Sequence, residues 1–252
     1  ETGIIVSMLG LILVLSRFQI RWTNRRYEVS RWLLAFSMFV LAGHYVLQMA
    51  YGFRAKGDEV GAVVNVLFYT PISFIISYAT YNLICYRSGR KKFALLGCVS
   101  YALILICFFF GYKDTPRGMH IGEWLYVMLA LFAVTIIYCI YTTVIEMRYH
   151  RKIIEENTTE DLLPFDRYAY ASYGMVGFLI LALVGAICYR PFLYCVAPLI
   201  LFSLIFFTIT FLGYGYNMIP AEVRLEQETA DEPLEVLEVS DEVELSLIHI
   251  SE

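Results

Sequence analysis

The chain of 252 residues is 59% hydrophobic and only 17% charged, and its formal net charge is -4. Because soluble domains carry about 25% charged residues, this composition excludes an ordinary water-soluble fold and indicates a protein whose solvent is lipid. The basic residues form no patch with interleaved aromatic side chains, which argues against direct nucleic-acid binding by this part of the chain.

Seven apolar runs follow one another along the chain. A membrane-spanning helix needs about 20 largely apolar residues, and six of the runs meet this length, whereas the first is short. The runs are Gly3–Ser16, Trp32–Tyr51, Ala62–Tyr86, Phe93–Tyr112, Glu123–Ile145, Tyr168–Tyr189 and Phe192–Tyr214. We therefore predict an all-α, polytopic membrane protein with about seven transmembrane helices in one domain over residues 1–216. The short first run leads us to expect further residues upstream of Glu1.

Lysine and arginine are unevenly distributed among the connections between these runs. The first, third and fifth connections together hold thirteen of them, and the other three connections hold five. Because lysine and arginine favour the cytoplasmic loops of membrane proteins, we predict an N-terminus outside and a C-terminus in the cytoplasm. The expected location is the bacterial inner membrane, which the chain crosses several times.

Two of the apolar runs carry polar side chains at helical spacing. His44 and Gln48 are four residues apart in the second run and therefore share a helix face. The third run carries a polar stripe at intervals of three or four residues, formed by Asn65, Tyr69, Ser73, Ser77 and Thr80. Since polar residues inside a membrane mark functional sites in many proteins, we take His44, Gln48, Asn65, Tyr69 and Ser73 as the candidate ligand-sensing residues.

Two interpretations of these polar residues stay open. The first is structural, because polar side chains between membrane helices hydrogen-bond one another and hold the helices together. The second is a ligand- or proton-sensing cavity between the second and third runs, open to the outside. His44 bears on this choice because an imidazole in contact with water titrates near neutrality.

No feature of the sequence predicts an enzyme. The apolar runs hold no paired carboxylates and no recognisable catalytic motif. The six cysteines show neither C-x-x-C spacing nor a spacing with histidine that would form a metal site. We therefore expect no metal site and no cofactor. A transporter is a weaker alternative, because no inverted repeat with paired broken helices is visible.

The composition changes after the last apolar run. Residues 217–244 are rich in acidic side chains and hold a single base, Arg224, which is typical of a solvated cytoplasmic linker. The last eight residues, LSLIHISE (Leu245–Glu252), resemble the translated end of a transposase-type sequencing adapter. This resemblance implies that residues 245–252 are not native, and we expect the natural coding sequence to continue from about Glu244.

The segment SRWLLAFSMFVLAGHYVLQMAYGFRAKGDEVGAVVNVLFYTPISFIISYATYNL (Ser30–Leu83) resembles the membrane half of polytopic transcriptional regulators from Bacteroides-like bacteria. The resemblance implies a sensor or membrane anchor whose acidic linker leads to a helix-turn-helix output domain of the AraC type. The expected partners are the lipid bilayer, an unknown signal ligand, and DNA through that further C-terminal domain; a homodimer is compatible with this plan. The alternatives are the sensor of a histidine kinase, and a small-molecule transporter or membrane enzyme subunit.

Overall fold

A computed structural model describes residues 2–16, 25–53, 57–85, 89–115, 118–157, 171–178 and 195–215. Over these ranges the chain is almost entirely helical. The helices are α1 (Thr2–Leu15), α2 (Arg25–Tyr51), α3 (Asp58–Ile84), α4 (Arg90–Gly111) and α5 (Trp124–Asn157), followed by a helical segment over 171–178 and the helix Cys195–Gly215. Two short strands, β1 (Lys113–Thr115) and β2 (Gly118–His120), lie between α4 and α5.

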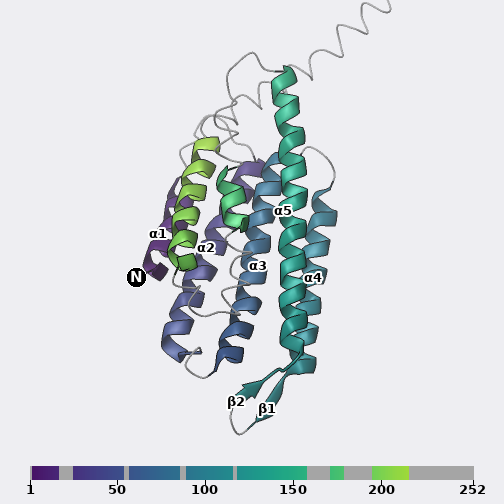
Figure 1. Ribbon diagram of the computed structural model, residues 1–252. Helices are drawn as coiled ribbons and strands as arrows, with labels where there is room; N and C mark the ends of the chain where they lie inside the picture. The colour runs from purple at the N-terminus through teal and green to yellow at the C-terminus, as the bar shows by residue number, and fades with distance from the viewer. Residues whose placement is uncertain are drawn as a thin grey trace, which may run out of the picture.

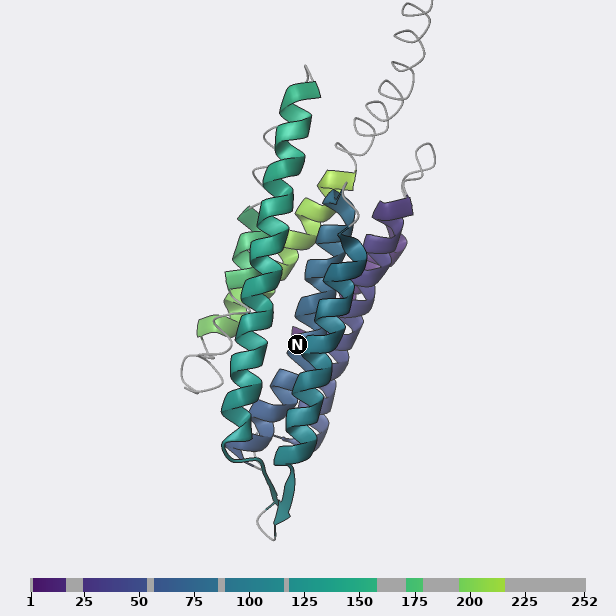
Figure 2. The same cartoon turned by 90° about the vertical axis from the view of Figure 1, so that its right-hand side faces the viewer.

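The helices pack side by side as one bundle (Figure 1). Successive helices from α1 to α5 run in alternating directions, so that α2 and α4 begin, and α3 and α5 end, at the same end of the bundle (Figures 1 and 2). We call this end the base-rich end, because nine of the ten described lysines and arginines belong to it. The strands β1 and β2 mark the opposite end, which we call the hairpin end.

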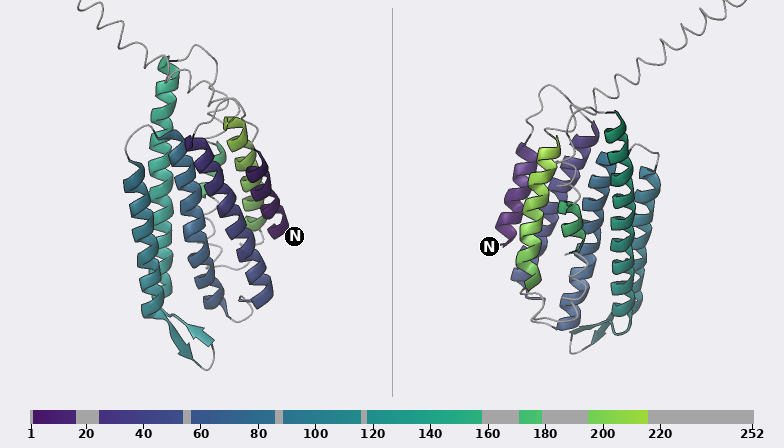
Figure 3. Two further views of the ribbon diagram at one scale, coloured as in Figure 1. Left: turned by 180° about the vertical axis from the view of Figure 1, so that it is seen from behind. Right: turned by 45° about the horizontal axis from the view of Figure 1, so that its top comes forward.

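α3 is the central helix of the bundle. It packs against α2, α4 and α5. Of its apolar stretch of 18 residues, 61% is buried inside the protein, compared with 22% for the equivalent stretch of α4. α1 and the helix Cys195–Gly215 lie side by side at one edge, and α4 and α5 form the other edge (Figures 1 and 3). The polar stripe predicted on the third apolar run therefore belongs to the helix that has protein neighbours on most sides.

Within the described residues, five helices are long and apolar enough to cross a membrane, namely α2, α3, α4, α5 and Cys195–Gly215. Large apolar side chains on their outer faces are largely exposed, as for Met49 (81%), Phe109 (73%) and Phe110 (72%). Exposed apolar surface on this scale suits a lipid solvent and not water. The chain is thus a helical, membrane-spanning protein, as its composition predicted.

The seven predicted spans are described to different extents. α1 has 14 residues, or about 21 Å of helix, which is shorter than the roughly 30 Å hydrocarbon layer. Of the predicted span Tyr168–Tyr189, only the helical segment over 171–178 belongs to the described residues. The predicted acidic linker over 217–244 and the terminal residues 245–252 lie outside them.

The hairpin is an addition to the all-α fold that the hydropathy pattern did not predict. β1 and β2 pair antiparallel, with Lys113 opposite His120 and Thr115 opposite Gly118. The hairpin is fixed to the start of α3, where the Glu59 carboxylate accepts a hydrogen bond from the Ile121 amide at 3.3 Å and lies 2.7 Å from Nδ1 of His120. Three-residue strands carry too little apolar pattern to stand out beside membrane-length runs.

A buried arginine attaches the short helix α1 to α2. Arg31 is only 2% exposed, and its guanidinium donates hydrogen bonds of 3.0 Å to the carbonyl oxygens of Leu13 and Val14, at the C-terminal end of α1. A third contact joins it to the Glu28 carboxylate at 2.6 Å. Helix C-termini carry unpaired carbonyls and a partial negative charge. Arg31 satisfies both and stabilises the end of a helix that is too short to be stable alone.

Candidate functional site

Three of the five predicted site residues form one hydrogen-bonded cluster between α2 and α3. The Asn65 amide oxygen lies 2.5 Å from Nε2 of Gln48 and 3.2 Å from Nε2 of His44, and the Gln48 amide nitrogen lies 3.1 Å from the same His44 nitrogen. We call His44, Gln48 and Asn65 the polar triad. The spacing of His44 and Gln48 placed them on one helix face, and the structure turns this face toward α3.

The polar triad is enclosed by protein and lies toward the hairpin end. His44 is fully buried, Asn65 is 2% exposed, and Gln48 is half-buried at the edge. Aromatic rings surround the imidazole: Phe68 stacks on it with ring centroids 4.7 Å apart, and Tyr69 meets it edge-on at 5.1 Å. Such a low-polarity surround strengthens each hydrogen bond and raises the cost of leaving one unmade.

The hydrogen-bonding chemistry of the polar triad has two alternative states. In a neutral imidazole one ring nitrogen donates and the other accepts, so Nε2 of His44 can either donate to the Asn65 oxygen or accept from the Gln48 amide. The ring cannot do both through one nitrogen. A change of tautomer, protonation or amide orientation therefore exchanges the partner of His44 without moving a helix.

Tyr69 and Ser73 continue the α3 stripe beyond the polar triad. Tyr69 is half-buried and touches the triad through its ring contact with His44. Ser73 is 2% exposed but lies eight residues, or about 12 Å, along α3 from Asn65. The structure thus brings Tyr69 to the triad and leaves Ser73 outside it, on the way toward the base-rich end.

A second buried polar stripe lies on α5 and was not predicted. Its members are spaced by four, four, three and four residues and are at most 7% exposed: Thr135, Cys139, Thr143, Glu146 and His150. Glu146 directly follows the predicted run Glu123–Ile145, and its side chain is only 7% exposed. The signal was present as helical spacing, although threonine and cysteine are too common in membrane helices to attract attention individually.

Tyr173, from the helical segment over 171–178, joins the two stripes. Its hydroxyl lies 3.1 Å from the Ser77 hydroxyl on α3 and 3.4 Å from the Cys139 carbonyl oxygen on α5, both within hydrogen-bonding reach. At the base-rich end of the α5 stripe, His150 Nε2 lies 3.2 Å from the hydroxyl of Tyr214 on the last helix. Buried polar contacts therefore link α3, α5 and the last described helix.

The end of the last described helix is held by α2 as well. The Phe211 and Tyr27 rings stack with centroids 5.1 Å apart. Gly215 approaches Tyr27 so closely that any side chain there would overlap the tyrosine ring. A shift of α2 or α5 at the base-rich end would consequently alter the contacts of Tyr214 and Gly215. These two residues lie just before the acidic segment that begins at residue 217.

Among the described residues, no group of three histidine, cysteine, aspartate or glutamate side chains could hold a metal ion. The chain matches no family model, no curated protein and no solved structure. The arrangement of the polar side chains is consequently the observation on which a function must be argued.

Proposed function

We propose that the chain is the membrane-embedded sensor or anchor region of a bacterial signal-transduction protein. The observation that carries the proposal is the polar triad, a buried hydrogen-bonded cluster with two alternative bonding states. Such a cluster is costly in a membrane interior and can respond to a proton or to a small ligand. The role fits better than catalysis, since the triad has no nucleophile and no carboxylate.

The path of the signal follows the buried contacts. A change at the polar triad acts on α3, whose polar stripe reaches Ser77. Tyr173 connects Ser77 to the backbone of α5, and His150 of α5 contacts Tyr214 at the end of the last described helix. These contacts form a continuous packed route from the polar triad to the base-rich end. Measured along the helix axis, its length is about 25–30 Å. The structural alternative, in which the triad only holds α2 against α3, makes a different prediction in the test below.

The proposed orientation has the base-rich end in the cytoplasm of a bacterial inner membrane, with seven spans in all. It is supported by the gathering of nine described lysines and arginines at one end, against Lys113 alone at the other. The signal would then enter from the outer face or from the bilayer and leave toward the acidic segment over 217–244.

The proposed output is a DNA-binding domain of the helix-turn-helix type that follows the acidic segment, as in the regulators that the segment Ser30–Leu83 resembles. A histidine kinase domain in the same place is the first alternative. A transporter or a membrane enzyme subunit is the second alternative. The observation that favours it is the buried polar stripe on α5, which includes the carboxylate of Glu146.

Two measurements test the proposal. The reading frame in the source DNA is sequenced beyond codon 244: a helix-turn-helix domain agrees with the regulator, and an ATP-binding kinase domain selects the first alternative. In the full-length protein, His44→Ala and Asn65→Ala are then compared with Ser37→Ala, whose hydroxyl bonds only within α2. Altered output at normal membrane insertion supports sensing, and unchanged output with both triad variants reduces the triad to a structural contact.

A further inference from the structure

One buried carboxyl group takes no part in the contacts between the polar triad and the last helix. This group belongs to Glu146 of the α5 stripe, whose side chain is 7% exposed. Its Oε1 atom is shielded from solvent and has no hydrogen-bond partner among the residues that the structure describes. The ion pairs of the described residues lie elsewhere, within α2 and between α3 and the hairpin. Within the described part of the chain, Glu146 is thus buried without a counter-charge.

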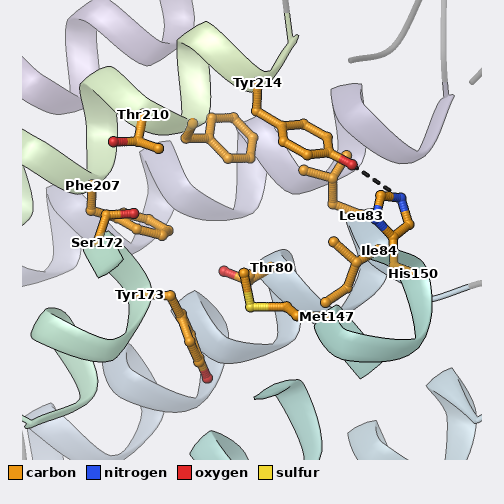
Figure 4. A pocket seen from close by; sticks show the side chains of 11 residues that line it. Thr80, Leu83, Ile84, Met147, His150, Ser172, Tyr173, Phe207, Thr210 and Tyr214 are labelled. Atoms are coloured by element: carbon orange, nitrogen blue, oxygen red, sulfur yellow. Dashed lines mark hydrogen bonds between the residues drawn. The ribbon is translucent and has the colours of Figure 1, made fainter. Parts of the chain in front are cut away.

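The polar neighbours of Glu146 on α5 have partners of their own. Thr142 donates a hydrogen bond from its hydroxyl to a carbonyl oxygen of the same helix at 2.8 Å. His150, one turn further along, turns toward the last helix, where its Nε2 lies 3.2 Å from the Tyr214 hydroxyl (Figure 4). Arg148 is the nearest base in the sequence, but it is exposed, and residues two apart do not share a helix face. None of these neighbours supplies the positive charge that a carboxylate needs.

A small cavity adjoins this part of α5. It lies between α3, α5, the helical segment over 171–178 and the last described helix, and Thr80, Met147, Tyr173 and Tyr214 are among its lining residues (Figure 4). Its volume is about 30 Å³, which has room for about two water molecules, because one water needs roughly 10–15 Å³. A ligand that reaches α5 from this side is therefore no larger than water or a small ion.

The helices packed against α5 present phenols and thiols on this side. Glu146 lies within electrostatic reach of the Tyr81 hydroxyl on α3, and Tyr81 is 8% exposed. Tyr81 shares a buried cluster with Cys85 and Cys139, among other residues. Tyr173, from the segment over 171–178, adds a further buried phenol. Phenols and thiols carry no positive charge in any protonation state, so they do not neutralise a carboxylate.

An ionised carboxylate in such surroundings is costly. A charge that leaves water for a low-dielectric interior is stabilised only by a counter-charge and by hydrogen bonds. The lysines at the start of α4, Lys91 and Lys92, are exposed, and no described base of α4 pairs with Glu146. A small cation bound at the carboxylate removes this cost, either as a proton in an O–H bond or as a sodium ion with oxygen ligands.

We propose that Glu146 is the binding site of a small monovalent cation, a proton or a sodium ion, which neutralises the carboxylate inside the bundle. The bound cation removes a net charge from the interface between α5 and α3. The packing of these two helices is thereby coupled to the ions in the water at the base-rich end. The site is distinct from the polar triad and does not depend on the sensor role, because cation binding requires no output domain.

Dicyclohexylcarbodiimide tests the site in the full chain, purified in detergent and in a buffer without sodium. This apolar reagent reacts with a carboxyl group that carries its proton. The proton passes to one nitrogen of the carbodiimide, the carboxylate oxygen bonds to the central carbon, and the acyl group then migrates to the other nitrogen to give a stable N-acylurea. Peptide mass spectrometry measures this adduct. Glu146 should be labelled roughly tenfold faster than Glu123, which is exposed at the other end of α5.

Added salt distinguishes the two cations. Sodium chloride protects Glu146 from the reagent if sodium is the ligand, whereas choline chloride at the same ionic strength does not. If the ligand is a proton, the two salts have the same effect and labelling falls as the pH is raised. In sodium dodecyl sulfate at a concentration that unfolds the chain, Glu146 and Glu123 should be labelled alike, which shows that the folded bundle causes the difference.

A neutral variant supplies an independent measurement. Glu146→Gln keeps the shape of the side chain without its charge, so it should retain the melting temperature of the parent chain in the buffer without sodium. The proposal is overturned by equal labelling of Glu146 and Glu123 in the folded chain. It is also overturned by a marked loss of stability in Glu146→Gln, because that loss would show that the ionised carboxylate has an ionic partner within the protein.

Discussion

His44, Gln48 and Asn65 illustrate why polar side chains are informative inside a membrane. Each would cost several kcal/mol if it faced hydrocarbon alone, so their spacing on two apolar runs joined by a short connection predicted that they would meet. The structure confirms the meeting of these three. It leaves Ser73 apart, because a stripe of residues shares a face but extends over several turns of the helix.

Asn65 supplies the oxygen that both other members of the polar triad approach. Asn65→Leu should therefore lower the free energy of unfolding by about 1–2 kcal/mol. Unfolding in mixed micelles with increasing sodium dodecyl sulfate measures this change. Ser37→Ala is the control, because the Ser37 hydroxyl bonds to Leu34 of its own helix, and it should cost little. A double-mutant cycle with Gln48→Leu that gives no coupling energy would show that the triad does not act as a unit.

Arg31 immediately precedes the run Trp32–Tyr51 and is one of the thirteen bases from which the orientation is predicted. In the structure it has a second role, in packing. Arg31→Leu should destabilise the protein by about 2 kcal/mol or more, since it leaves the carbonyls at the end of α1 unpaired in a buried position. Glu28→Gln should cost less, because Glu28 is 32% exposed and keeps contact with water. Thermal unfolding of both variants measures the difference, and equal effects would contradict the capping role.

At the scale of the elements, hydropathy predicted which helices exist better than where they begin and end. α2 begins at Arg25, although the apolar run begins at Trp32, and α5 continues to Asn157, although its run ends at Ile145. The apolar run marks the part of a helix that lipid or protein covers. A helix can continue beyond it into water, because its backbone hydrogen bonds are internal and residues such as Glu, Arg and Lys favour the helical state.

The contact between α3 and α4 depends on a glycine. A side chain at Gly97 would overlap the ring of Phe74 on α3, whereas a side chain at Gly43 on α2 would meet nothing within 4 Å. Gly97→Ala should therefore destabilise the protein by about 1–3 kcal/mol. Gly43→Ala should be neutral or slightly stabilising, since alanine favours the helix over glycine. Similar melting temperatures for the two variants would show that α3 and α4 separate without cost.

At the scale of the whole molecule, the sequence predicted a helical membrane protein and three members of one polar cluster, but neither the α5 stripe nor the cavity. The α5 stripe consists mainly of residues that also occur singly as packing residues, so its significance depends on which face α5 turns inward. The cavity is formed by residues from four helical segments that are distant in sequence, such as Thr80 and Tyr214. Features of this kind depend on the packing of the bundle and are not encoded in any one run.

The orientation of the whole bundle is the prediction on which the direction of signalling depends. In a chain from which the native cysteines have been removed, Gly118→Cys at the hairpin end should react with a membrane-impermeant maleimide in intact spheroplasts, because this end is expected outside. Ser88→Cys, in the third connection of the sequence, and Asn157→Cys, at the end of α5, should react only after the membrane is permeabilised.

The difference follows from charge. The first, third and fifth connections carry thirteen lysines and arginines and the other three carry five, so the orientation that keeps the larger set in the cytoplasm is the favoured one. Glu123→Cys, at an exposed position in the turn before α5, serves as a second site at the hairpin end and should label as Gly118→Cys does. The reverse labelling pattern would place the acidic segment after Gly215 outside the cell, where a DNA-binding output could not act, and would refute the proposed direction of the signal.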